Sequence, residues 1–181
     1  MRNNCLCKGV LAVAMLCVAP GALPASATAS QPGAGTLKSR KGAFASNASS
    51  LLQQVQNDAQ RVRNNADRLE ARLREPFLND WESDGSLLER MRARVNAMDK
   101  LLLQLRTNHS KALPWQQQAI ERIAPSVVNL TDTTEAAVVS LNQNQGEVYQ
   151  SNVYGLSQDL YNQAGLITKT IRDVEKSAAE K

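Results

Sequence analysis

The sequence predicts an all-α protein, an antiparallel up-down-up-down four-helix bundle with coiled-coil-like heptad packing. Apolar residues recur at alternating intervals of four and three along four long segments. Aromatic residues make up only 4% of the chain, and aliphatic cores with few aromatics suit helix-on-helix packing better than sheets. Short connections favour neighbouring helices that run in opposite directions. Helical hairpins that complete their core only as a dimer are the alternative architecture.

The first helix is predicted from Ala48 until Pro76 stops it, because proline lacks the backbone N–H that a helix interior requires. After a polar loop, the second helix is predicted to begin at the capping box formed by Ser86 and Glu89. The apolar stripe of the first helix is Ala48, Leu52, Val55, Ala59, Val62, Ala66, Leu69 and Leu73. The stripe of the second is Leu88, Met91, Val95, Met98, Leu102, Leu105, His109 and Ala112.

Pro114 is well placed in the first turn of the third helix, and Gly146 is a natural C-terminal cap. Pro125 interrupts this segment, so we expect a kink or a brief break over residues 121–125. The fourth helix is predicted over residues 152–179. The third stripe is Ile120, Ile123, Val127, Leu130, Thr134, Ala137 and Leu141, followed by polar Asn144. The fourth is Val153, Leu156, Leu160, Ala164, Ile167, Ile171, Val174 and Ala178.

Residues 1–27 have the pattern of a cleaved secretory signal peptide, with a basic start at Arg2 and Lys8, an apolar centre, and an Ala-x-Ala site at residues 25–27. A cut after Ala29 is the alternative. The apolar run has roughly half of the ~20 residues that cross the hydrocarbon layer, so no membrane span is expected after cleavage. We therefore expect a periplasmic or extracellular bacterial protein.

Cleavage removes all three cysteines, and with them disulfides, thiol catalysis and thiolate metal sites. It also lowers the formal net charge from +4 to +2, which is too mild to indicate nucleic-acid binding. Residues 28–44 are rich in Gly, Pro and Lys/Arg and are interpreted as a flexible tether. Residues 45–181 are predicted to form a single helical domain.

Two groups of residues are candidates for partner binding. Phe77 and Trp81 lie in the loop after the first helix, where they either form an exposed anchor or plug the end of the bundle. The predicted topology places them near Tyr149 and Tyr154 and leaves Phe44 and Trp115 at the opposite end.

The other candidates are arginines that lie off the apolar stripes. If the two arginine-rich faces align, they would hold an anionic surface such as a phosphate-bearing envelope glycan; otherwise they are solvated faces with i,i+4 pairing. Arg61, Arg68 and Arg72 are the arginines that we predict to bind a partner. The first face comprises Arg61, Arg63, Arg68, Arg72 and Arg74, and the second Arg90, Arg92, Arg94 and Arg106.

Sequence motifs for catalysis are missing. His109 is the only histidine and lies near a helix end, where it is interpreted as a half-buried packing residue. Di-iron bundles require Glu-x-x-His pairs, but Arg106 occupies the position three residues before His109. No phosphate-binding glycine loop or Gly-x-Ser-x-Gly sequence occurs. We therefore predict no enzyme activity, no catalytic residue, no cofactor and no metal.

The stretch from Leu113 to Gln145 resembles a group of exported bacterial helical proteins that have no assigned activity. The residues that carry the resemblance are Pro114-Trp115-Gln116, Ala119-Ile120 with Ile123 and Pro125, and Leu141-Asn142-Gln143-Asn144. It covers about a fifth of the chain and implies a bacterial, exported, helical protein without indicating a functional residue.

Three functions follow as expectations. The first is a non-enzymatic exported bundle that binds or scaffolds an envelope protein or an anionic envelope polymer. The second is a periplasmic stress or chaperone-like protein that forms homodimers and holds clients. The third, a remote alternative, is a cofactor carrier or an enzyme.

Overall fold

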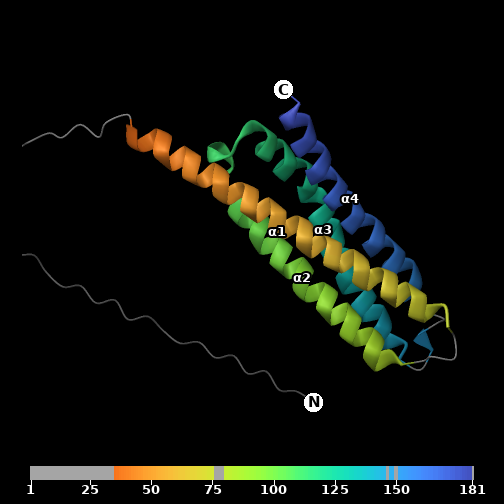
Figure 1. Ribbon diagram of the computed structural model, residues 1–181. Coiled ribbons are helices and arrows are strands. Elements are labelled where there is room, and N and C mark those ends of the chain that lie inside the picture. Colours follow the sequence, from red (N-terminus) through yellow and green to blue (C-terminus); the bar gives the residue numbers. More distant parts are fainter. Residues whose placement is uncertain (1–34, 76–79, 146, 149–150, 181) are drawn as a thin grey trace, which may run out of the picture. The chain divides into compact units, whose positions relative to one another are not determined.

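The computed structural model describes residues 35–75, 80–145, 147–148 and 151–180 (Figure 1). Within these ranges the chain is helical and has no strand, so the predicted all-α class is confirmed. The predicted signal peptide lies outside the described residues, as do Phe77, Gly146 and Tyr149. The elements are α1 (Gly35–Leu73), α2 (Trp81–Thr107), the short 3₁₀ helix η1 (His109–Lys111), α3 (Pro114–Gln143) and α4 (Val153–Ala179).

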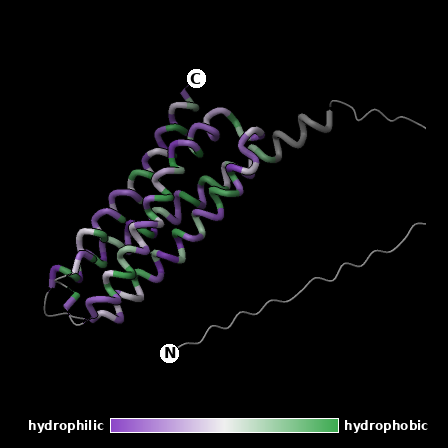
Figure 2. Tube along the Cα trace, turned by 180° about the vertical axis from the view of Figure 1, so that it is seen from behind, coloured by the Kyte–Doolittle hydropathy of each residue, from purple (hydrophilic) through white to green (hydrophobic). Residues whose placement is uncertain are grey.

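The four long helices pack side by side as a bundle (Figure 1). Each helix packs against its neighbour in chain order, and α4 also packs against α1, which closes the ring. Hydrophobic residues recur at short intervals along each helix between hydrophilic ones (Figure 2). A helix with this pattern buries one stripe and exposes the rest to water. No helix in the described ranges is long and apolar enough to cross a membrane.

The apolar stripes predicted from the sequence form the core of this bundle. In α1 every stripe residue from Ala48 to Leu69 is at most 1% exposed, and Leu73 is partly buried against the core. Burying a Leu, Ile or Val side chain contributes about 1.5–3 kcal/mol to stability, so these stripes supply most of the driving force for folding. His109, Asn144, Leu156 and Ala178 are the stripe positions of the other helices that are only half-buried.

The beginning of α2 differs from the prediction. The helix begins at Trp81 rather than after the expected capping box at Ser86, so that part of the expected loop is helical. Asp80 is the N-cap, and its carboxylate accepts a hydrogen bond of 3.1 Å from the backbone N–H of Ser83. Glu82 in the first turn is favourable at the positive end of the helix dipole. These signals outweigh the glycine that separates Asp80 from the expected start.

The first turns of α1 also differ from the expectation. The helix begins at Gly35, so residues 35–44 are helical although the sequence predicts a flexible tether there. No proline follows Pro32 in this stretch, and Leu37 and Lys38 are good helix formers. Extending a helix that is already anchored in a core avoids the cost of nucleation, so moderate propensity suffices.

Pro125 does not break α3, which is continuous from Pro114 to Gln143. Proline removes the hydrogen bond to the carbonyl four residues earlier, which belongs to Glu121. Both Pro125 and Glu121 are exposed, so the missing hydrogen bond lies on the solvent side of the helix and the apolar stripe keeps its phase.

A buried glutamine fastens the start of α3 to α1. The amide of Gln116 is fully buried and donates to the carbonyl of Ala45 (2.8 Å) and to the hydroxyl of Ser49 (2.9 Å). Its oxygen accepts from the backbone N–H of Leu113 (2.8 Å), which caps α3. This end of the bundle also holds the partly buried Phe44 and Trp115, as the sequence predicts.

Candidate functional site

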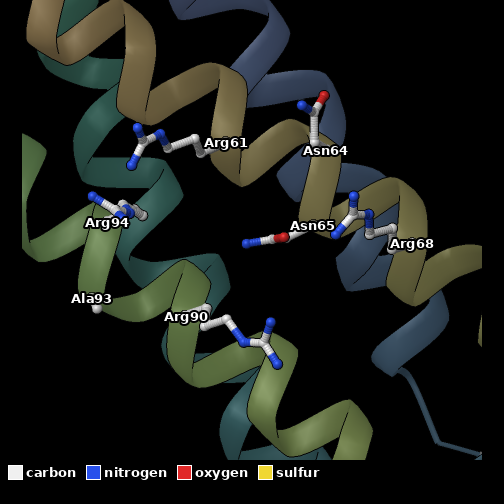
Figure 3. A pocket seen from close by; sticks show the side chains of 7 residues that line it. All are labelled: Arg61, Asn64, Asn65, Arg68, Arg90, Ala93 and Arg94. Atoms are coloured by element: carbon white, nitrogen blue, oxygen red, sulfur yellow. The ribbon is translucent and has the colours of Figure 1, made fainter.

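A basic groove runs between α1 and α2 (Figure 3). Its volume is about 390 Å³. Side chains from the two helices border the space between them, and Asn65 points into it (Figure 3). The lining residues are Arg61, Asn64, Asn65, Arg68, Arg90, Ala93 and Arg94. We call this site the arginine groove.

Helical periodicity explains why these residues share one site. Arg61, Asn65 and Arg68 are spaced four and three residues apart, which places them on one flank of α1. Arg90 and Arg94 are four residues apart and lie on the flank of α2 that meets it. Since the apolar stripe of each helix turns toward the core, these arginines remain at the rim.

The electrostatics of the arginine groove are one-sided. Of the described residues that line it, none is acidic. Asp58, which is 14% exposed, accepts a hydrogen bond of 3.2 Å from Arg94. Arg90 donates to the hydroxyl (2.9 Å) and the carbonyl (3.2 Å) of Ser86, which orient its guanidinium without neutralising it. Arg61 and Arg68 form no ion pair with any described residue.

Four guanidinium groups therefore line the groove, and among the described residues only that of Arg94 pairs with a carboxylate. Arginine keeps its charge at every physiological pH and presents a planar fork of donors that fits phosphate, sulfate and carboxylate groups. The asparagine amides add neutral donors and acceptors. The lining holds no nucleophile and no general base, so its chemistry is suited to holding an anion.

Arg72, the third arginine predicted to bind a partner, lies elsewhere. Its Nε donates to Asp84 Oδ1 at 2.7 Å, and a second nitrogen donates to Asp80 Oδ2 at 3.3 Å. The hydrogen bond that Arg72 donates to the buried carboxylate of Asp84 raises the pKa of Arg72. Arg72 thus joins the end of α1 to the beginning of α2 and its charge is already compensated.

Trp81 lies at the first turn of α2 and is 37% exposed. It borders a separate groove of about 350 Å³ between α2 and α3, together with Leu88, Val138 and Leu141. Trp81 therefore does not line the arginine groove, and its predicted companion Phe77 lies outside the described residues.

Of the three arginines selected from the sequence, Arg61 and Arg68 line the groove and Arg72 does not. Arg92 belongs to the other flank of α2, where it pairs with Glu89 (3.2 Å) and Glu135 (3.0 Å). The two asparagines that complete the groove carried no chemical signal of their own. Their spacing with Arg61 and Arg68 is the one feature that could have revealed them.

His109 lies in η1, and its Nε2 is 3.2 Å from Glu121 Oε1. This contact joins the connection after α2 to α3. Among the described residues, no three or more His, Cys, Asp or Glu side chains are grouped so that they could hold a metal ion.

Comparison with known proteins does not extend these observations. The chain matches no family model, and neither the curated proteins nor the solved structures gave a match.

Proposed function

We propose that this chain is an exported, non-enzymatic helical-bundle protein of the bacterial cell envelope that binds an anionic partner in the arginine groove. The observation that carries the proposal is the imbalance of four guanidinium groups against one carboxylate, with Arg61 and Arg68 unpaired among the described residues. An uncompensated basic groove on a chain of mild net charge concentrates its attraction at one place.

The proposal includes export. Its support is the basic start, short apolar centre and Ala-x-Ala site of residues 1–27, a pattern that carries the chain across a membrane before it is removed. The envelope of bacteria is rich in phosphate-bearing and carboxylate-bearing polymers, which fit the chemistry of the groove.

It also includes an antiparallel up-down-up-down arrangement with heptad packing. Two ion pairs support this topology for α1 and α2, because Arg72 meets Asp84 while Asp58, earlier on α1, meets Arg94, later on α2. The burial of residues at alternating intervals of four and three supports knobs-into-holes packing. In this arrangement the C-terminal part of α1 lies beside the N-terminal half of α2, which brings Arg61 and Arg68 close to Arg90 and Arg94.

Binding of inorganic pyrophosphate to the purified protein, measured by isothermal titration calorimetry at low ionic strength, tests the proposal. We expect the triple variant Arg61→Gln/Arg68→Gln/Arg90→Gln to bind about a hundredfold more weakly, because each exposed guanidinium contributes about 1 kcal/mol. The matched control is Lys100→Gln/Arg106→Gln/Arg122→Gln, which removes the same charge from exposed positions outside the groove. An equal loss in both variants would show that net charge alone attracts the anion and would refute the proposed site.

A further inference from the structure

A second basic groove lies on the other flank of α1, where that helix meets α4. Its volume is about 510 Å³, and the charged residues of its lining are Arg63 of α1 and Lys169, Arg172 and Asp173 of α4. We call it the α1/α4 groove. It shares no lining residue with the arginine groove, but both are bordered by the same stretch of α1, residues 60–68. The two grooves are therefore separated by the width of one helix, about 10–12 Å with side chains.

The α1/α4 groove also carries uncompensated charge. Arg63 donates a hydrogen bond to the hydroxyl of Tyr161, and its guanidinium carbon lies 4.4 Å from the centre of the ring. Tyrosine is neutral at physiological pH, so this contact positions Arg63 and leaves its charge available. Lys169 pairs with Asp173, whereas Arg172 is exposed and forms no ion pair with any described residue.

The ridge between the two grooves is polar. Asn64, which also lines the arginine groove, and Asp67 are exposed on this stretch of α1. Of the side chains whose burial the structure describes, the large exposed hydrophobic ones lie at Trp81, Leu103, Leu113, Val128, Val139 and Leu166, and none of them belongs to residues 44–73 of α1. Proteins that bind membrane surfaces insert apolar side chains as well as contacting charged headgroups. This surface therefore fits a chain-like polyanion better than a lipid surface.

We propose that the arginine groove and the α1/α4 groove are two subsites for one linear polymer with repeating phosphate groups, which crosses α1 and engages both. The inference rests on the proposed function and specifies its ligand class. A polymer held at the first groove presents its next phosphates to the second at a high effective concentration, so occupying both strengthens binding without a new contact at either. The carboxylates on or beside this surface are those of Asp58, Asp67 and Asp173, fewer than the seven basic side chains that line the two grooves.

The test compares pyrophosphate with polyphosphate of several tens of units, with affinities expressed per phosphate to remove the statistical gain of a long chain. For the unmodified protein we expect the long probe to bind at least a hundredfold more tightly than the short one. The variant Lys169→Gln/Arg172→Gln is expected to reduce this ratio at least tenfold. The control variant Lys100→Gln/Arg106→Gln, which removes the same charge from α2, is expected to preserve it.

The outcomes separate the two proposals. If pyrophosphate binds but the ratio is the same in the Lys169→Gln/Arg172→Gln variant, the two-subsite inference is wrong and the arginine groove stands alone. If neither probe binds, the proposed function itself is wrong. Vesicles of phosphatidylcholine and phosphatidylglycerol in a 7:3 ratio provide the membrane arm, and tighter binding to them than to polyphosphate would overturn the assignment to a polymer.

Discussion

Two stretches of α1 carry the same kind of side chain and use it differently. In the last third of the helix, before its final turn, Arg61 and Arg68 border an open groove and form no ion pair with a described residue. At the end of the helix, Arg72 pairs with Asp84 and Asp80, and Arg74 contacts Glu70 and the hydroxyl of Tyr154. The difference lies in what the neighbouring helices present to each stretch.

The beginnings of α2 and α4 supply the partners at the end of α1. Asp80 and Asp84 come from the first residues of α2, where carboxylates are favoured by the helix dipole, and Tyr154 comes from the first turn of α4. The hydrogen bonds that Arg74 donates to Tyr154 and Glu70 raise the pKa of Arg74. In the middle of the bundle α2 presents Arg90 and Arg94 instead. The function of an arginine here is therefore decided by the helix opposite it.

Breaking the ion pair between Arg72 at the end of α1 and Asp84 at the beginning of α2 is expected to have the largest effect on stability. In Arg72→Met the carboxylate of Asp84, whose side chain is 3% exposed, loses the partner that compensates its burial. We expect the free energy of unfolding to fall by about 2 kcal/mol, or roughly 6 °C in Tm, measured by urea and thermal unfolding.

Two controls isolate the ion pair. Arg68→Met removes an arginine of the open stretch and is expected to change stability by less than ~0.5 kcal/mol. In the Asp84→Asn background, Arg72→Met is expected to cost less than it does alone, because no buried charge is then left unpaired. If the two arginine variants were equally destabilised, the contrast between the stretches would be wrong.

Placing a negative charge in the arginine groove should weaken anion binding. Ala93 lines the arginine groove from an exposed position on α2, so Ala93→Glu places a carboxylate among Arg61, Arg68 and Arg90. We expect pyrophosphate to bind about fivefold more weakly, the equivalent of ~1 kcal/mol, with no loss of stability. The matched control Ala93→Gln has the same size without the charge and is expected to bind like the unmodified protein. Equal weakening by both would indicate a steric effect.

The smallest expected effect is on the pH dependence of stability that arises from Asp80 at the beginning of α2. The pKa of Asp80 is lowered, chiefly by the hydrogen bonds from Ser83 and also by the charge of Arg72. A lowered carboxyl pKa stabilises the folded state above the unfolded pKa of about 3.9, and this stability is lost as the pH falls through the folded pKa.

The variant Asp80→Asn tests this dependence, because asparagine is an N-cap of similar strength that cannot ionise. We expect its Tm to lie slightly below that of the unmodified protein above about pH 5 and the difference to shrink below about pH 4. A difference that grows on acidification would contradict the assignment. Thermal unfolding followed by circular dichroism between pH 3 and pH 7 provides the measurement.

The fold was largely predictable because the interactions that build it repeat along the chain. The stripe from Ala48 to Leu69 is buried as its spacing predicts, and Pro114 opens α3. The start of α2 was predicted less well, because Asp80 and Ser86 are both suitable N-caps and the helix uses Asp80. Residues 35–44 were misread for a related reason, since a weak local preference for helix prevails once the helix is anchored further along.

By itself the sequence determined which side of each helix faces the core, because burial follows the spacing of apolar residues along the chain. It also marked the arginines as candidates. Only the tertiary structure decided that Arg61 and Arg68 meet two more arginines while Arg72 meets two carboxylates. The physical reason is that hydrophobic periodicity is a property of a single helix. Charge compensation depends instead on the distance of a few ångströms between side chains of two helices, and residues distant in sequence set that distance.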